Sequence, residues 1–149
     1  MNAPVDPHFA ARIRASFARQ KAMVLIGATL GHVGPGVVEI ELPFRDDLTQ
    51  QKGYVHGGII GMIADSACGY AAFSLMPADC SLVTVEYKIN ILAPATNSLV
   101  ARGEVVRAGR TLTVSRAEVY ADTGNKFGKH VATMQQTLMM LPGVPDDRE

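Results

Sequence analysis

The chain has 149 residues, of which 48% are hydrophobic and 19% are charged, and its 14 Lys and Arg balance 14 Asp and Glu. This composition is typical of a folded globular protein and argues against a disordered chain. The balanced charge, without a basic run, argues against nucleic-acid binding through neutralisation of phosphates. The length suits one core, so we expect a single domain over residues 1–149.

In chain order, the first expected element is a short amphipathic helix over about residues 7–21. Asp6 would be its N-cap and Pro7 its first residue, and apolar residues recur every four positions from Phe9. Residues 22–28 form an apolar run that is too short to span a bilayer and lacks a cleavage context, so we interpret it as part of a strand. After the helix we expect a strand at 24–30, a turn at 34–36 and a half-buried strand at 38–42.

The segment 57–75 is apolar nearly all round, which predicts a long buried helix that Pro77 ends. Four strands are then expected at 82–92, 99–107, 111–121 and 127–141, followed by a frayed tail at 142–149. Tight turns rather than crossover helices join these strands, which favours one antiparallel sheet. We therefore predict an α+β fold in which an antiparallel sheet wraps around a long central helix.

The cysteines and histidines indicate no metal chemistry. Cys68 and Cys80 lack the C-x-x-C spacing, and the histidines do not cluster at metal-ligand spacing. We expect two reduced thiols, no metal ion, no membrane association and a cytoplasmic location. His32 and His130 receive no role.

The start of the long helix carries the most informative pattern in the chain. His56, Gly57 and Gly58 open the helix, and free backbone N–H groups at a helix N-terminus attract negative charge. Asp65 is the only charged residue between Gly57 and Leu75. A carboxylate within an apolar helix is costly unless it is paired or solvated. Asp65 is therefore either a satisfied structural group or a reactive one.

This pattern, with the strand at 83–90 and the turn at 106–111, resembles the PaaI-like family of hotdog-fold acyl-CoA thioesterases over roughly residues 35–140. The resemblance implies a hotdog fold, a homodimer joined edge to edge, and a homotetramer as the common assembly. Active sites would lie at the dimer interface, where the acid and the His-Gly-Gly turn come from different subunits. The substrate would be an aryl- or medium-chain acyl-CoA, and no cofactor is expected, since coenzyme A is part of the substrate.

The resemblance also implies roles for individual residues. Asp65 would act as general base on water or as nucleophile on the thioester carbonyl, and the sequence leaves both open. The Gly57 N–H would contact the developing oxyanion, whereas Gly58 would border the substrate or only shape the turn. His56 would hold the turn by hydrogen bonding rather than act as the principal base. Gln50 would orient the carbonyl or the attacking water, with Gln51 as its alternative.

Other candidates are less specific. Thr84 would orient water near the acid, although a threonine is equally at home in a strand. Met62 would line the acyl pocket. Cys68 would line it too rather than act as a nucleophile, since no base that could activate its thiol is apparent. Three cations are candidates for the coenzyme A phosphates and equally for solvated surface positions: Lys88, Arg107 and Arg110.

Two other functions are compatible with such a fold. A non-hydrolytic acyl-CoA binding protein would bind the same ligand without releasing a thiol, but it would normally need an effector domain. A hotdog hydratase or dehydratase is disfavoured because those relatives pair an acid with a catalytic histidine in different local motifs.

Overall fold

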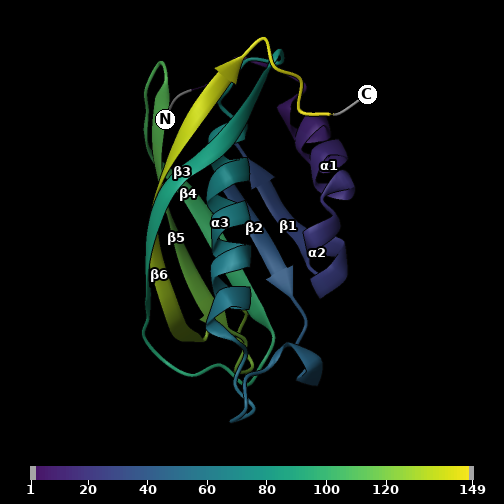
Figure 1. Ribbon diagram of the computed structural model, residues 1–149, viewed down its shortest axis with the longest axis vertical. Helices are drawn as coiled ribbons and strands as arrows, with labels where there is room; N and C mark the ends of the chain where they lie inside the picture. The colour runs from purple at the N-terminus through teal and green to yellow at the C-terminus, as the bar shows by residue number, and fades with distance from the viewer. Residues whose placement is uncertain (1–2, 148–149) are drawn as a thin grey trace.

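The computed structural model describes residues 3–147. A six-stranded sheet in the order β1-β2-β4-β5-β6-β3, with every neighbouring pair antiparallel, curves around the long helix α3 (Figure 1). The predicted α+β fold is confirmed. The elements are α1 (Phe9–Arg19), α2 (Lys21–Ile26), β1 (Thr29–Gly34), β2 (Val37–Leu42), a 3-10 turn (Asp46–Leu48), α3 (Gly57–Phe73), β3 (Cys80–Ile91), β4 (Leu99–Ala108), β5 (Leu112–Ala121) and β6 (Lys129–Pro142).

Small residues let α3 sit deep against the sheet. A methyl group at Gly103 of β4 would overlap the backbone carbonyl of Ala67 on α3, so the helix and the sheet meet backbone to backbone at that point. Around this contact, alternate residues of β5 and β6 face the helix and are fully buried, among them Val119 and Leu138. Among residues 3–147, no helix combines the length and apolar character needed to cross a membrane.

Arg12 fixes α1 to the C-terminal end of α3. Its guanidinium donates hydrogen bonds to the backbone carbonyls of Phe73, Met76 and Pro77 at 3.1, 2.8 and 2.7 Å. Phe73 is the last residue of α3, and Met76 and Pro77 follow it, so Arg12 binds the chain where it leaves the helix. The guanidinium also stands 4.1 Å from the centroid of the Phe73 ring. Figure 1 shows α1 and α2 beside α3 on the side of β1.

The predicted strand at 24–30 is wrong except at its last two residues. Residues Lys21–Ile26 form α2, which ends at Gly27 in the left-handed region with φ of 74°, and β1 begins only at Thr29. Met23 and Ile26, three residues apart, are buried, whereas Val24 and Leu25 between them are exposed. A helix buries residues at that spacing, and a half-buried strand does not.

Both ends of the described chain also differ from expectation. The N-cap of α1 is His8 rather than Asp6. Asp6 instead accepts a hydrogen bond from the His8 amide at 2.8 Å and pairs with Arg12 at 3.0 Å, one turn into the helix. The tail is not simply frayed, because Asp146 forms an ion pair with Arg19 of α1 at 2.9 Å. Residues 148 and 149 of the predicted tail lie outside the described residues.

Candidate active site

Asp65 lies halfway along α3 and is held by side chains from two strands. The Thr84 hydroxyl of β3 donates a hydrogen bond to Asp65 Oδ1 at 2.8 Å. The Gln136 amide of β6 donates to the same oxygen and to Thr84 Oγ1, the latter at 2.7 Å. Within residues 3–147, the other carboxylate oxygen, Oδ2, accepts no hydrogen bond. One oxygen is therefore anchored, and the second is left for water or substrate.

A pocket of about 340 Å³ opens beside Asp65, between α1, α3, β3 and the C-terminal segment. Its wall is mixed in polarity. The Ser16 hydroxyl and the Tyr70 phenol are 3.2 Å apart, and the Arg19–Asp146 ion pair closes one side. Burial raises the pKa of the Tyr70 phenol, which keeps it neutral at physiological pH. The pocket is lined by Ser16, Arg19, Gln20, Asp65, Ser66, Gly69, Tyr70, Phe73, Leu82, Thr84 and Asp146.

The His-Gly-Gly turn forms the N-terminus of α3 and leaves one backbone donor free. His56 is the N-cap, and its Nδ1 accepts a hydrogen bond from the Gly58 amide at 2.9 Å. The amides of Ile59 and Ile60 donate to the His56 carbonyl at 2.9 and 3.1 Å. Within residues 3–147, the Gly57 N–H at this terminus has no such partner. His56 thus holds the turn through a hydrogen bond, and the donor that remains is the one predicted to contact an oxyanion.

The two glycines of the turn differ in the space around them. A methyl group at Gly57 would meet no atom closer than Ile91 Cγ1 at 4.0 Å. One at Gly58 would lie only 3.0 Å from His56 Nδ1. Glycine is therefore favoured at 58, where a methyl group would crowd the imidazole of the cap, whereas residues 3–147 leave room for a methyl group at Gly57.

A second pocket lies in front of this turn. Gln50 and Gly57 both line it, together with Tyr54 and the chain at 91–95 that follows β3. The Gln50 side-chain oxygen accepts a hydrogen bond from the Lys52 amide, and its backbone N–H donates to the Tyr54 carbonyl at 2.8 Å. Gln50 is thus held in a tight turn and lines the same pocket as Gly57, and its role in orienting a carbonyl or water stays a prediction. Gln51, its alternative, is exposed.

The two pockets cannot serve one carbonyl within a single subunit. Gly57 and Asp65 are eight residues apart on the same helix, which separates them by about 12 Å along its axis. Both pockets nevertheless border β3, the acid pocket at Thr84 and the turn pocket at Ile91. Within residues 3–147, β3 is an edge strand that pairs with β6 alone.

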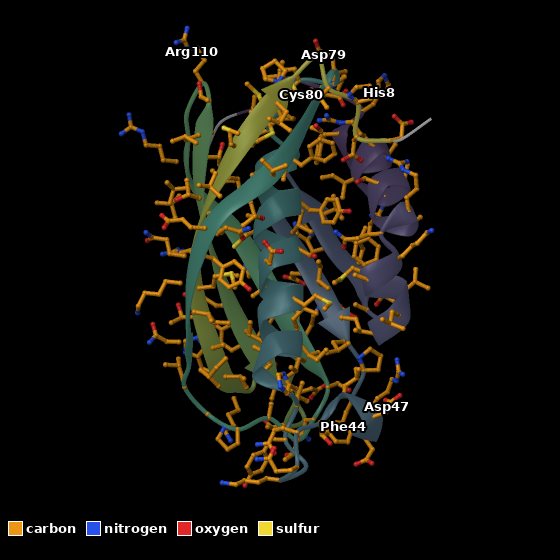
Figure 2. All side chains as sticks on the ribbon, in the orientation of Figure 1. His8, Phe44, Asp47, Asp79, Cys80 and Arg110 are labelled. Atoms are coloured by element: carbon orange, nitrogen blue, oxygen red, sulfur yellow. The ribbon has the colours of Figure 1, made fainter. Side chains whose placement is uncertain are left out.

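The structure places the remaining predicted residues away from the acid pocket. Cys68 is fully buried in the core, where burial and the nearby Asp65 carboxylate raise the pKa of its thiol, so it does not line the pocket wall. Met62 is half-buried and packs against the core. Lys88 lies on the outer face of β3 and donates to Asn90 at 2.8 Å. Arg107 and Arg110 are exposed near the β4–β5 turn, and Figure 2 shows Arg110 at the end of the molecule opposite Phe44.

Gln136 is the site residue that the sequence analysis missed. It is 1% exposed, and it occupies an inward position of β6 between the buried Met134 and Leu138. A polar residue at a core position of an alternating strand was the available signal. Recognising its role, however, required knowing that β6 pairs with β3, which sets Gln136 opposite Tyr87 and near Thr84.

Comparison with known proteins agrees with this architecture. The family model described as the thioesterase superfamily matches residues 52–138. A thioesterase family protein from Silicibacter pomeroyi is 46% identical with a TM-score of 0.85, over 91% of this chain and 99% of that one. A Halobacterium salinarum protein, provisionally named an esterase, is 31% identical over 72% of this chain and 76% of its own length. The Escherichia coli PaaI protein of the phenylacetic acid degradation operon, at 20% identity, shares the fold with a TM-score of 0.82 over 93% of this chain and 97% of that one. The chain belongs to the thioesterase superfamily and has the hotdog fold.

Proposed function

We propose that this protein is a cytoplasmic acyl-CoA thioesterase that hydrolyses aryl- or medium-chain acyl-CoA to the free acid and coenzyme A. The reaction requires a group that activates or replaces water and a donor that stabilises the oxyanion. Asp65, anchored through one oxygen and open at the other, is the observation that carries the proposal. No cofactor takes part.

In the proposed reaction, the thioester carbonyl oxygen accepts a hydrogen bond from the Gly57 N–H. Asp65 either removes a proton from water as it attacks the carbonyl carbon or attacks that carbon itself. The C–S bond then breaks, and the coenzyme A thiolate leaves and takes up a proton. In the second route the acyl group is left on Asp65 as an anhydride, which water then hydrolyses to the free acid and the carboxylate. Thr84 and Gln136 hold the carboxylate in one orientation throughout. Such positioning supports catalysis because it reduces reorganisation in the transition state.

The active site would be shared between two copies of the chain. Asp65 and Gly57 are too far apart in one subunit to reach the same carbonyl, and β3, which borders both pockets, has a free edge. Five apolar residues along this edge are exposed, and a long exposed apolar edge strand normally pairs with another strand. They are Val83, Val85, Tyr87, Ile91 and Leu92. An antiparallel pair of β3 strands would reverse one subunit against the other, and dimers would associate further into a homotetramer.

The acid pocket supports the proposed acyl class. Its volume is about 340 Å³, whereas a cavity of about 150 Å³ already holds benzene. Phe73 and Leu82 offer apolar surface, and Ser16 and Tyr70 offer hydroxyl groups. An aryl group or a chain of medium length fits such a wall. The basic residues that would bind the coenzyme A phosphates are proposed to be among Lys88, Arg107 and Arg110.

The test is thiol release from a panel of aryl, short-, medium- and long-chain acyl-CoAs. Rapid release by the wild type, fastest with aryl or medium-chain substrates, is the expected result. Saturable binding without release would overturn the proposal in favour of a non-hydrolytic binding protein. Addition of water to an enoyl-CoA would favour a hydratase. A single turnover in ¹⁸O-labelled water distinguishes the two roles of Asp65. A nucleophilic carboxylate that is regenerated by attack of water on its own carbonyl passes an unlabelled oxygen to the product and keeps the label, whereas a general base directs the label into the product.

A further inference from the structure

We infer that two copies of this chain pair through β3 in one particular register, with Tyr87 facing the partner's Tyr87 on the dyad and Glu86 opposite the partner's Lys88. The inference rests on the proposed function, because it specifies how the two halves of the proposed active site meet. It follows from four observations on the free edge of β3.

The first observation is where β3 is accessible. Cys80 and Ser81 at its start are buried, whereas the strand from Val83 to Ile91 is exposed apart from the half-buried Ile89. A symmetric antiparallel pair is centred on the segment that both strands can offer. The exposed segment is centred on Tyr87.

The second observation is the direction of the side chains. Glu86, Lys88 and Asn90 pair in register with Thr137, Gln135 and Thr133 on the outer face of the sheet. Tyr87 pairs with the buried Gln136 and therefore points inward. In an antiparallel pair, residues that stand directly opposite share a face, and a one-residue slip would set an outward residue against an inward one. The dyad must therefore pass through a residue, and the candidates near the centre are Glu86, Tyr87 and Lys88.

The third observation is charge, which distinguishes these three registers. A dyad on Glu86 would set two carboxylates against each other, and a dyad on Lys88 would set two ammonium groups against each other. A dyad on Tyr87 sets Glu86 opposite the partner's Lys88 twice over. Opposite charges in such cross-strand pairs are stabilising, and like charges are destabilising. Like-charge contacts also select against wrong registers.

The fourth observation is the position of the half-sites. Thr84, which binds Asp65 at 2.8 Å, would stand near the partner's Asn90 and Ile91. Within a subunit, Ile91 is the residue nearest to the open space in front of Gly57. The dyad on Tyr87 thus brings the acid of one copy towards the free N–H of the other. Moving the dyad by one residue shifts the partner strand by two residues, or about 7 Å. Such a shift would carry the partner's Gly57 N–H out of hydrogen-bonding distance of a carbonyl bound at Asp65.

The inner face leaves room for this arrangement. The Tyr87 hydroxyl lies 3.8 Å from the position that a Cβ would occupy at Gly61, so the ring rests over the part of α3 that lacks a side chain. Tyr87 is 48% exposed in the single chain, and the two rings would cover each other at the dyad. The bulge between Thr84 and Glu86 limits the regular ladder to the residues nearest the dyad.

Three single-cysteine variants distinguish the registers. Two copies of one cysteine stand directly opposite each other, and can form a disulfide, only when the dyad passes through that position. Residues directly opposite have Cβ atoms about 5 Å apart, whereas diagonal neighbours are about 7–8 Å apart, too far for a disulfide. Under mild oxidation, Tyr87→Cys should form a covalent dimer, and Glu86→Cys and Lys88→Cys should not. Mixing the last two should give a cross-linked heterodimer. The wild type is the control for Cys68 and Cys80, both of which are buried.

Charge reversal provides an independent measurement, with the dimer dissociation constant from sedimentation as its readout. Glu86→Lys and Lys88→Glu should each raise this constant about tenfold, because two attractive pairs become repulsive. The double variant, with both charges exchanged, should return to within about threefold of the wild type. Arg14→Glu, a charge reversal on the exposed face of α1, should leave the dimer dissociation constant unchanged.

The outcomes separate this inference from the proposed function. Efficient self-cross-linking of Glu86→Cys or Lys88→Cys overturns the register, and so does a failure of the charge exchange to restore the dimer, even if the wild type hydrolyses acyl-CoA. A dimer that none of the three cysteines cross-links overturns pairing through β3. Conversely, if Tyr87→Cys cross-links but the wild type releases no thiol from acyl-CoA, the register is supported and the proposed function is wrong.

Discussion

The two ends of the segment of α3 from Gly57 to Asp65 are built in opposite ways. Asp65 is fixed by Thr84 and Gln136, which reach it from two strands. Gly57 stands at the exposed N-terminus of the helix, where the His56 cap and the first turn bind the neighbouring amides. The acid is thus positioned by long-range pairing, and the donor by local geometry. A carboxylate close to the core needs partners to be tolerated, whereas a helix terminus supplies an unpaired N–H without any added group.

The largest effect is expected from the acid end, with Asp65→Asn. Loss of a general base or nucleophile should lower kcat by roughly 10²–10⁴-fold. The melting temperature should change little, because an amide oxygen can still accept from Thr84 and Gln136. Thiol release and thermal unfolding measure the two effects, with the exposed Asp147→Asn as the matched control. Full activity in Asp65→Asn would show that the carboxylate is a structural group.

The turn end is tested by a pair of alanine variants. Gly57→Ala should fold normally, because its methyl group meets no atom of the chain within 4.0 Å, but it should block approach to the N–H and lower kcat/KM by about 10–100-fold. Gly58→Ala should crowd the His56 imidazole and weaken the cap, at a cost of about 1 kcal/mol. That loss corresponds to a melting temperature lower by roughly 2–4 °C. If Gly57→Ala retained full activity, the proposed oxyanion contact would be wrong.

Gln136→Met separates positioning from stability at the acid end. Methionine has a similar length but cannot donate to Asp65 or Thr84, so kcat should fall by about tenfold as the carboxylate becomes free to rotate. The melting temperature should stay constant or rise, because the buried Oε1 of Gln136 has no partner within residues 3–147 and an unpaired buried acceptor is costly. A large loss of stability with unchanged kcat would assign Gln136 a purely structural role.

The smallest effect is expected far from either end, at Glu39 on the outer face of β2. Burial alone would raise the pKa of this carboxyl, but hydrogen bonds from Lys126 and Arg102 outweigh it and hold the pKa below its usual value of 4.5. Glu39 therefore stabilises the fold above that pH, and the contribution is lost as the pH falls through the lowered pKa. Glu39→Gln should melt earlier than the wild type at pH 7, and the difference should shrink by pH 3. Parallel melting curves across that range would contradict this assignment.

Some elements of the fold could be predicted from the sequence, and others could not. Strand alternation and turn residues predicted five of the six strands, β2 to β6, and the all-round apolar pattern predicted α3, because those signals are local. The prediction of a strand at 22–28 was wrong because a short apolar stretch has no clear period. Only the burial pattern shows that Met23 and Ile26 lie on one face of a helix. The contact of Gln136 with Asp65 was not predicted, for a different reason. Its partners are 71 and 52 residues away in the chain, and no local pattern encodes that register.

The contact between Gly103 and Ala67 has a consequence for how substrate range can change. Because α3 rests on the sheet through backbone atoms there, the position of α3, and with it of Asp65, relative to β4 is set by main-chain geometry and is insensitive to most side-chain replacements. The wall of the pocket beside Asp65 is partly built from α1 and the C-terminal segment, through residues such as Ser16, Arg19 and Asp146. If this pocket binds the acyl group as proposed, exchanging these terminal segments for those of a relative should alter substrate selectivity while the position of Asp65 is kept.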